Sequence, residues 1–136
     1  MMEYEVLFRG KRLDNGEWVY GIPATLINLS GAPYTAIIPI YSFANDLAGL
    51  KSVDPSTVGQ YTGLTDKNGV KIFVEDIISY NGSREVVRFD TSLRIPCFTT
   101  GIGRGSSTAP HPYKISVRHV VIGNIHDNPE LLGGAK

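Results

Sequence analysis

Hydrophobic and polar side chains alternate along the middle of the chain in a pattern typical of β-strands. Val70, Ile72, Val74 and Ile78 occupy every second position, and the carboxylate of Asp76 interrupts the series. An alternation with a period of two predicts a strand with one half-buried face. A carboxylate is costly to bury alone, so we expect Asp76 at a kink, accepting backbone N–H bonds or pairing with a cation.

Turn sequences on both sides of this strand predict β-hairpins. Asn and Asp favour tight turns by hydrogen-bonding the backbone ahead of them, and Gly accepts the positive φ that such turns need. We therefore expect reversals at residues 66–69 (DKNG) and 81–82 (NG), the second leading into a strand at residues 84–89. A D-x-x-G turn followed by a hydrophobic residue, an acidic residue and a short strand opens many small SH3-like barrels, which favours such a barrel here.

The N-terminal half begins with a predicted hairpin and continues into an apolar segment that contains three prolines. Residues 3–13 and 17–22 are expected to be strands around an Asp-Asn-Gly turn. Prolines at positions 23, 33 and 39 then predict edge strands or irregular structure, because proline cannot donate to a sheet. Residues 41–50 have apolar side chains at helical spacing, and Ser42 could cap the start of a helix, so a short helix is expected there.

The C-terminal part is predicted to contain a long loop, a final strand and a helical turn. Residues 90–112 are rich in Gly, Ser, Thr and Pro, the composition of a flexible excursion. Residues 113–125 are expected to form a last strand pair, or one strand bent at Gly123. Asn128 and Pro129 favour a short helical turn, from which Leu131 and Leu132 would pack on the barrel.

These patterns predict a mainly β chain with little helix, in two parts. Residues 1–56 are expected to form an N-terminal hairpin with an apolar extension, and residues 57–136 an SH3-like β-barrel. We place the boundary between the two parts near Pro55, because proline prevents a helix from continuing. The predicted barrel core consists of Val58, Tyr61, Leu64, Ile72, Ile78, Val86, Val121 and Ile125.

Three separated blocks of the sequence resemble the YopX family of bacteriophage and prophage proteins. The blocks are RGKRLDNGEWVYG, VDPSTVGQYTGLTDKNGVKIFVEDII and VIGNIHDNPELL, in the order that the family has them. The resemblance implies a mainly β, self-associating protein with an SH3-like barrel in its C-terminal part, encoded in phage or prophage DNA, and it implies no biochemical activity. One position departs from the family pattern, because the family usually has a glycine before Asp76 and this chain has Glu75. The geometry of the local bulge is therefore open.

Overall composition excludes several classes of protein. Thirteen basic and thirteen acidic side chains balance to zero among 136 residues, so net charge does not attract nucleic acid or membrane headgroups. The single cysteine, Cys97, excludes an internal disulfide framework and fits a reducing cytoplasm. We see neither a signal peptide nor an apolar stretch long enough to span a membrane, and expect a soluble protein in the cytoplasm of a bacterial host.

Candidate catalytic and metal-binding residues are few and scattered. His111, His119 and His126 show no spacing typical of a metal site, and Cys97 would need the fold to bring a histidine beside it. A glycine-rich run at residues 101–105 does not match either phosphate-binding motif. The carboxylates of Asp66, Glu75 and Asp76 are interpreted as structural, although the turn after Asp66 resembles part of an EF-hand loop. We therefore expect no enzymatic activity, no metal and no cofactor.

Trp18 and Tyr20 are predicted to share one face of the N-terminal hairpin. Beside Arg9, Lys11 and Arg12 they could form a stacking platform for nucleic-acid bases. The alternative, a place in the core or in a subunit interface, is favoured because large aromatic side chains dominate burial in both.

Two classes of function remain. The first is an interaction or assembly protein that forms a homo-oligomer mainly through residues 1–52, or binds an unknown phage or host protein. Residues 21–50 support it, because Asp46 is their single charged residue among many apolar ones. The alternative is a nucleic-acid-binding module that uses the basic residues Arg84, Arg88, Arg94, Arg104, Lys114 and Arg118. Acidic residues are interleaved with these cations and dilute a basic face, so the first class is favoured.

Overall fold

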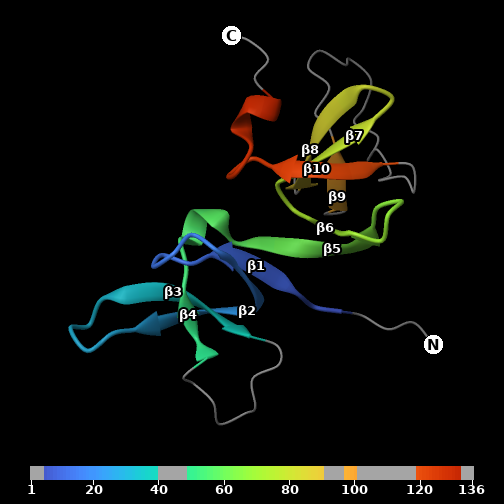
Figure 1. Cartoon of the computed structure of the whole chain (residues 1–136). Helices are drawn as coiled ribbons and strands as arrows, with labels where there is room; N and C mark the ends of the chain where they lie inside the picture. Colours follow the sequence, from blue (N-terminus) through green and yellow to red (C-terminus); the bar gives the residue numbers. More distant parts are fainter. Residues whose placement is uncertain (1–4, 40–48, 91–96, 101–118, 133–136) are drawn as a thin grey trace. The chain divides into compact units, whose positions relative to one another are not determined.

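The computed structural model describes residues 5–39, 49–90, 97–100 and 119–132, and strands dominate them (Figure 1). In chain order the elements are β1 (Phe8–Lys11), β2 (Trp18–Ile27), β3 (Pro33–Pro39), β4 (Lys51–Ser52), the 3-10 turn η2 (Pro55–Thr57), β5 (Gly59–Thr65), β6 (Lys71–Phe73), β7 (Asp76–Tyr80), β8 (Ser83–Asp90), β9 (Cys97–Thr100), β10 (Val120–Asn124) and the 3-10 turn η3 (Pro129–Leu131). The prediction of a mainly β chain is confirmed.

Two antiparallel sheets contain these strands, in the hydrogen-bonded orders β4-β3-β2-β1-β5-β6 and β10-β7-β8-β9. Within the described residues, backbone pairing closes neither sheet into a barrel. The chain divides into two compact units, Met1–Tyr61 and Thr62–Lys136. In the part of the chain that the structure describes, we find no helix that is long and apolar enough to span a membrane.

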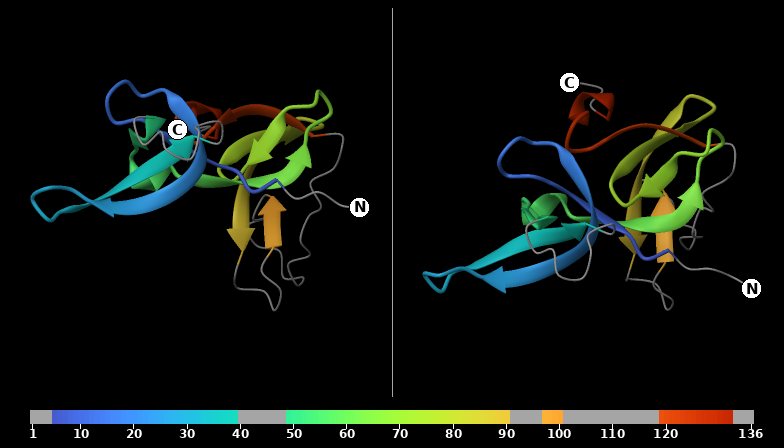
Figure 2. Two further views of the ribbon diagram at one scale, coloured as in Figure 1. Left: turned by 90° about the horizontal axis from the view of Figure 1, so that it is seen from below. Right: turned by 60° about the horizontal axis from the view of Figure 1, so that its bottom comes forward.

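Two consecutive hairpins build the N-terminal unit. The predicted turn before β2 is confirmed, and Gly16 supplies its positive φ of 72°. Within β2, Gly21 lies so close to β3 that an added Cβ would stand 1.9 Å from the carbonyl oxygen of Ile38. The two strands therefore approach closely where β2 leaves β1. Figure 2 shows the second hairpin, β2–β3, from two further sides.

Of the two outcomes predicted from the prolines, an edge strand is what the outer part of β2 forms, and irregular structure is wrong for β2 and β3. β2 and β3 pair without interruption from Gly21↔Pro39 to Ile27↔Pro33, and Pro23 lies opposite Ile37 within that register. The physical reason is that the pairing of β1 with β2 ends at Gly21. After Gly21, β2 pairs with β3 alone among the described residues. Its other edge forms no backbone hydrogen bonds with them, so Pro23, which has no N–H, costs no hydrogen bond there.

In the C-terminal unit, the predicted alternation fails after Phe73. A turn at Val74 and Glu75 separates β6 from β7, and Glu75 adopts a positive φ of 74°. Ile77 and Ile78 are both fully buried although neighbouring residues of a strand point to opposite faces, so both faces of β7 are covered there. Asp76 is buried as well, and its carboxylate accepts a 2.8 Å hydrogen bond from the Phe73 N–H, as predicted for a carboxylate at a kink.

The hairpin of β7 and β8 confirms the prediction made from Asn81 and Gly82. Tyr80 pairs with Ser83, and both turn residues have positive φ, 51° and 83°. Two positive φ values identify a type I′ turn, whose twist matches that of the flanking strands. The expectation of an excursion without packed elements over residues 90–112 is wrong at Cys97–Thr100, which pairs with β8 as β9. Residues 91–96 and 101–112 lie outside the described part of the chain.

Some of the predicted core residues are buried, and others are not. Tyr61, Ile72 and Ile78 are buried as expected. Leu64 is 43% exposed, and its assignment to the core was wrong because residues three apart on a strand point to opposite faces. Val87 is fully buried in place of the half-buried Val86, while Val58, Val121 and Ile125 are also half-buried.

The last described segment differs in detail from the prediction. β10 has an irregular register between Val121 and Gly123, which confirms the predicted bend. The predicted short helical turn is confirmed as η3, with Asn128 before it and Pro129 as its first residue. The Asn128 side chain accepts from the Asn124 N–H at 3.2 Å and does not cap η3. Leu132 is 43% exposed and does not pack as expected. The short helix expected at residues 41–50 falls largely outside the described residues.

Candidate interaction surface

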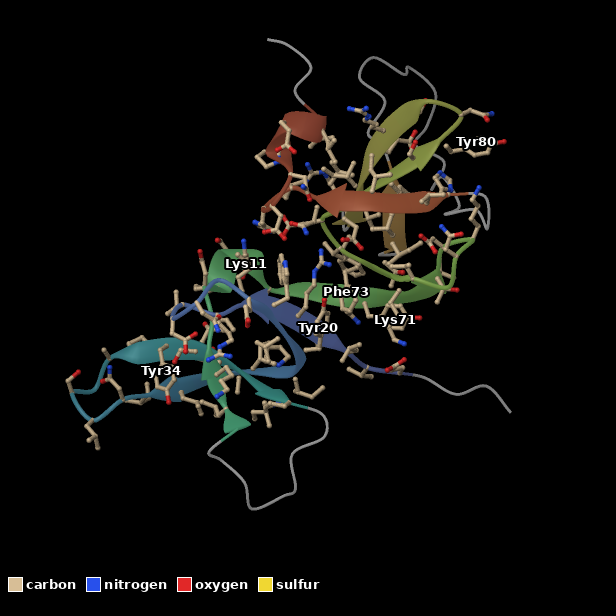
Figure 3. The ribbon with its side chains drawn as sticks, in the orientation of Figure 1. Lys11, Tyr20, Tyr34, Lys71, Phe73 and Tyr80 are labelled. Carbon is tan, nitrogen blue, oxygen red and sulfur yellow. The ribbon has the colours of Figure 1, made fainter. Side chains whose placement is uncertain are left out.

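The β2–β3 hairpin carries apolar side chains on one face. Leu26 lies opposite Tyr34 and Ile22 opposite Ile38, and Tyr20 stands two positions before Ile22 on the same side of β2. We call these five residues the hairpin face. Tyr20 and Ile22 are 43% and 41% exposed, and the other three are half-buried. Figure 3 shows Tyr20 toward the base of the hairpin and Tyr34 toward its tip.

The hairpin face is electrically neutral. From position 21 to position 50 the sequence contains one charged residue, Asp46, which lies outside the described segment. Charged residues are depleted at the centres of protein interfaces, and contiguous apolar surface is uncommon on monomers unless it binds something. The hairpin therefore has the composition of a contact surface.

A network of hydrogen bonds around Asn28 orders the tip of this hairpin. The Asn28 Oδ1 accepts from the Ser30 N–H at 3.0 Å, from the Ser30 hydroxyl at 2.7 Å and from the Ala32 N–H at 2.9 Å. The Asn28 N–H donates to the Ala32 carbonyl at 2.9 Å, and Gly31 supplies a positive φ of 88°. Between these anchors, Leu29 is fully exposed at 110% of its reference area.

The basic residues near Trp18 are brought together in part. The guanidinium carbon of Arg9 lies 4.5 Å from the centre of the Trp18 ring, and the Lys11 ammonium lies 5.7 Å from it. Arg12 instead binds Asp14 through two contacts of 2.9 and 2.6 Å. That hydrogen bond holds the pKa of Asp14 below its ordinary value. Arg9 and Lys11 therefore contact the indole within the same chain, and the favoured place of Trp18 in the core or in a subunit interface stays a prediction.

Of the six residues predicted for nucleic-acid contact, two are described. Arg84 and Arg88 are exposed on β8, and the Arg84 Nη1 donates to the Leu131 carbonyl at 3.0 Å. The remaining candidates, Arg94, Arg104, Lys114 and Arg118, lie outside the described residues. The structure therefore brings no cluster of these cations together within the segments that it describes.

The histidines occupy structural positions where they are described. His119 is buried and its ring centre lies 5.4 Å from that of Tyr80. His126 Nε2 lies 2.9 Å from Glu75 Oε1, a pairing that the sequence could not indicate because 51 positions separate the two. His111 and the side chain of Cys97 lie outside the description. In the described segments we find no three His, Cys, Asp or Glu residues placed to hold a metal ion.

The carboxylate of Asp66 accepts three hydrogen bonds from the backbone. Its Oδ1 accepts from the N–H groups of Asn68 and Val70 at 2.8 and 2.9 Å, and its Oδ2 accepts from the Val121 N–H at 3.0 Å. Burial alone would raise the pKa of Asp66, but these hydrogen bonds outweigh it, so the pKa lies below its ordinary value of 3.8. All three donors are backbone groups of this chain, which makes the carboxylate a structural element that joins the turn to β10.

Comparison with known proteins gives a family and a fold. The model of the family described as YopX protein matches residues 7–133. The crystal structure of protein EF1440 from Enterococcus faecalis is similar, with a TM-score of 0.55 and 24% sequence identity over 96% of this chain and 100% of that one. Because the identity is low, this similarity shows the fold alone. A search of curated proteins finds no match.

Proposed function

The chain belongs to the YopX protein family, and from this premise we propose that it is a phage- or prophage-encoded interaction or assembly protein that acts as a homo-oligomer and not as an enzyme. The hairpin face carries the proposal, because it combines exposed apolar side chains with an absence of charge over β2 and β3. Surfaces of this kind are typical of protein contacts.

We further propose a bacterial cytoplasm as the site of action and an SH3-like barrel as the architecture of the C-terminal unit. The first rests on the single cysteine, which suits a reducing compartment. The second is supported by the succession of short antiparallel strands from β5 to β10 and by the D-x-x-G turn after β5. The hairpin face lies on β2 and β3 and is not part of the proposed barrel.

Sedimentation equilibrium of the full chain tests the function. We expect a mass that is a whole multiple of the single chain at micromolar concentration. An electrophoretic shift panel with single- and double-stranded DNA and RNA provides the second arm, and no shift is expected at physiological salt. A monomer that shifts nucleic acid, with an affinity that falls steeply as salt rises, would contradict the proposal and support the alternative.

A further inference from the structure

The outer half of the β2–β3 hairpin extends beyond the strands that flank it (Figure 1). The pairing of β1 with β2 ends at Gly21, and β4 pairs with β3 at Ala36 and Ile37. The edges that remain carry Pro23 and Pro33, which cannot donate to an added strand. Proline on an edge disfavours strand addition, so a partner would bind this hairpin through side chains.

Leu29 has the properties of an anchoring residue. Its side chain is fully exposed, and the hydrogen bonds of Asn28 hold the backbone on both sides of it. A residue that is already ordered before binding loses less entropy when it enters a partner's surface. An exposed leucine on an ordered tip is therefore well suited to supply binding energy.

The two ends of the hairpin complement each other. The tip presents Leu29, whereas the base presents the half-exposed apolar side chains of Tyr20 and Ile22. The seven steps along the chain from Ile22 to Leu29 span about 23 Å when extended, so these groups lie too far apart to meet within one hairpin. If two hairpins lie antiparallel, each tip reaches the other base, and a two-fold axis makes the same contact twice. β2 and β3 themselves carry no charged residue, and Arg9, which lies opposite Tyr20 on β1, is buried, so like charges on these two strands do not oppose each other.

We propose that Leu29 of one copy packs against Tyr20 and Ile22 of a second copy, with the two β2–β3 hairpins antiparallel. This contact rests on the proposed function, since it specifies how the homo-oligomer forms. The partner is a second copy of the chain because one hairpin carries both the anchoring residue, Leu29, and the apolar surface of Tyr20 and Ile22 that Leu29 would contact.

The test is the dissociation constant for self-association of the full chain, measured by sedimentation equilibrium. Leu29→Ser should raise this constant about 100- to 10,000-fold, because the two-fold contact buries two leucine side chains and the substitution removes both. Leu13→Ser is the matched control, because Leu13 is 66% exposed near the turn of the other hairpin. It should leave the dissociation constant within about twofold of the original protein. Ile22→Ser should weaken association like Leu29→Ser.

The outcomes separate this contact from the proposed function. If the original protein associates and Leu29→Ser associates equally well, the tip is not the anchor and the contact is overturned, while the homo-oligomer stands. If Leu29→Ser weakens association and Ile22→Ser does not, the assigned receiving surface is wrong. If the original protein is monomeric at all concentrations, both the contact and the proposed function are overturned.

Discussion

Glu75 is held in a left-handed backbone conformation, with a φ of 74° that side chains other than glycine rarely adopt. Its N–H donates to the Val87 carbonyl at 2.7 Å, its carbonyl accepts from the Ile125 N–H at 3.1 Å, and its carboxylate contacts His126. These contacts join the residue to β8 and to the segment that follows β10. The glycine that the family pattern favours here would adopt this φ without strain.

The strain at Glu75 can be measured by comparing two substitutions. Glu75→Ala and Glu75→Gly both remove the contact with His126, but only alanine keeps a side chain at positive φ. We expect Glu75→Gly to be more stable than Glu75→Ala by roughly 1 kcal/mol in chemical denaturation. An alanine variant as stable as the glycine variant would show that the backbone is not strained there.

Asp66 contributes a pH-dependent part of the stability. Because its pKa is lower in the folded chain than its ordinary value of 3.8, the contribution is complete above that value and is lost as pH falls through 3.8 toward the folded pKa. Asp66→Asn should cost roughly 1.5–3 kcal/mol at neutral pH, the range for hydrogen bonds to a charged group. The difference in unfolding free energy between the two proteins should shrink below pH 3.8. A difference that is constant from pH 7 to pH 3 would exclude this role.

At the scale of elements, the buried cluster of Ile72, Ile78 and Val87 joins β6, β7 and β8. Ile72→Ala should cost about 2–5 kcal/mol, because the side chain is fully buried and its removal leaves a cavity. Val70→Ala is the control, since Val70 is 48% exposed. Urea denaturation measures both. A loss from Ile72→Ala no larger than that of the control would mean that the cluster does not hold these strands together.

The sequence predicts those elements whose conformation depends on residues only a few positions apart. The turns at Asn81–Gly82 and Asp66–Gly69 could be predicted, because their residue types favour positive φ and Asx hydrogen bonds over a few positions. The interrupting carboxylate predicts a kink near Asp76, but the positive φ of Glu75 could not be predicted, because a glutamate gives no signal for it and its partner His126 is distant in sequence. For the candidate surface, the lack of charge is visible in the sequence. The ordered exposure of Leu29 appears once the hydrogen bonds of Asn28 are known.

At the scale of the whole molecule, we assign different roles to the two units. In the C-terminal unit the bonded carboxylates Asp66, Glu75 and Asp76 contact groups of the same chain, which gives them structural roles. In the N-terminal unit the side chains of Tyr20, Ile22 and Ile27 on β2 are exposed, and residues 21–39 carry no charge. The central claim is therefore that copies of this chain associate through the β2–β3 hairpin.

Amide hydrogen exchange at low and high protein concentration tests that claim most directly, because association slows the exchange of amides in the contact surface. The account predicts that exchange across residues 22–38 slows as concentration rises, while exchange across the β7–β8 hairpin does not change. Exchange that is independent of concentration throughout, or that slows in the β7–β8 hairpin and not across residues 22–38, would contradict it.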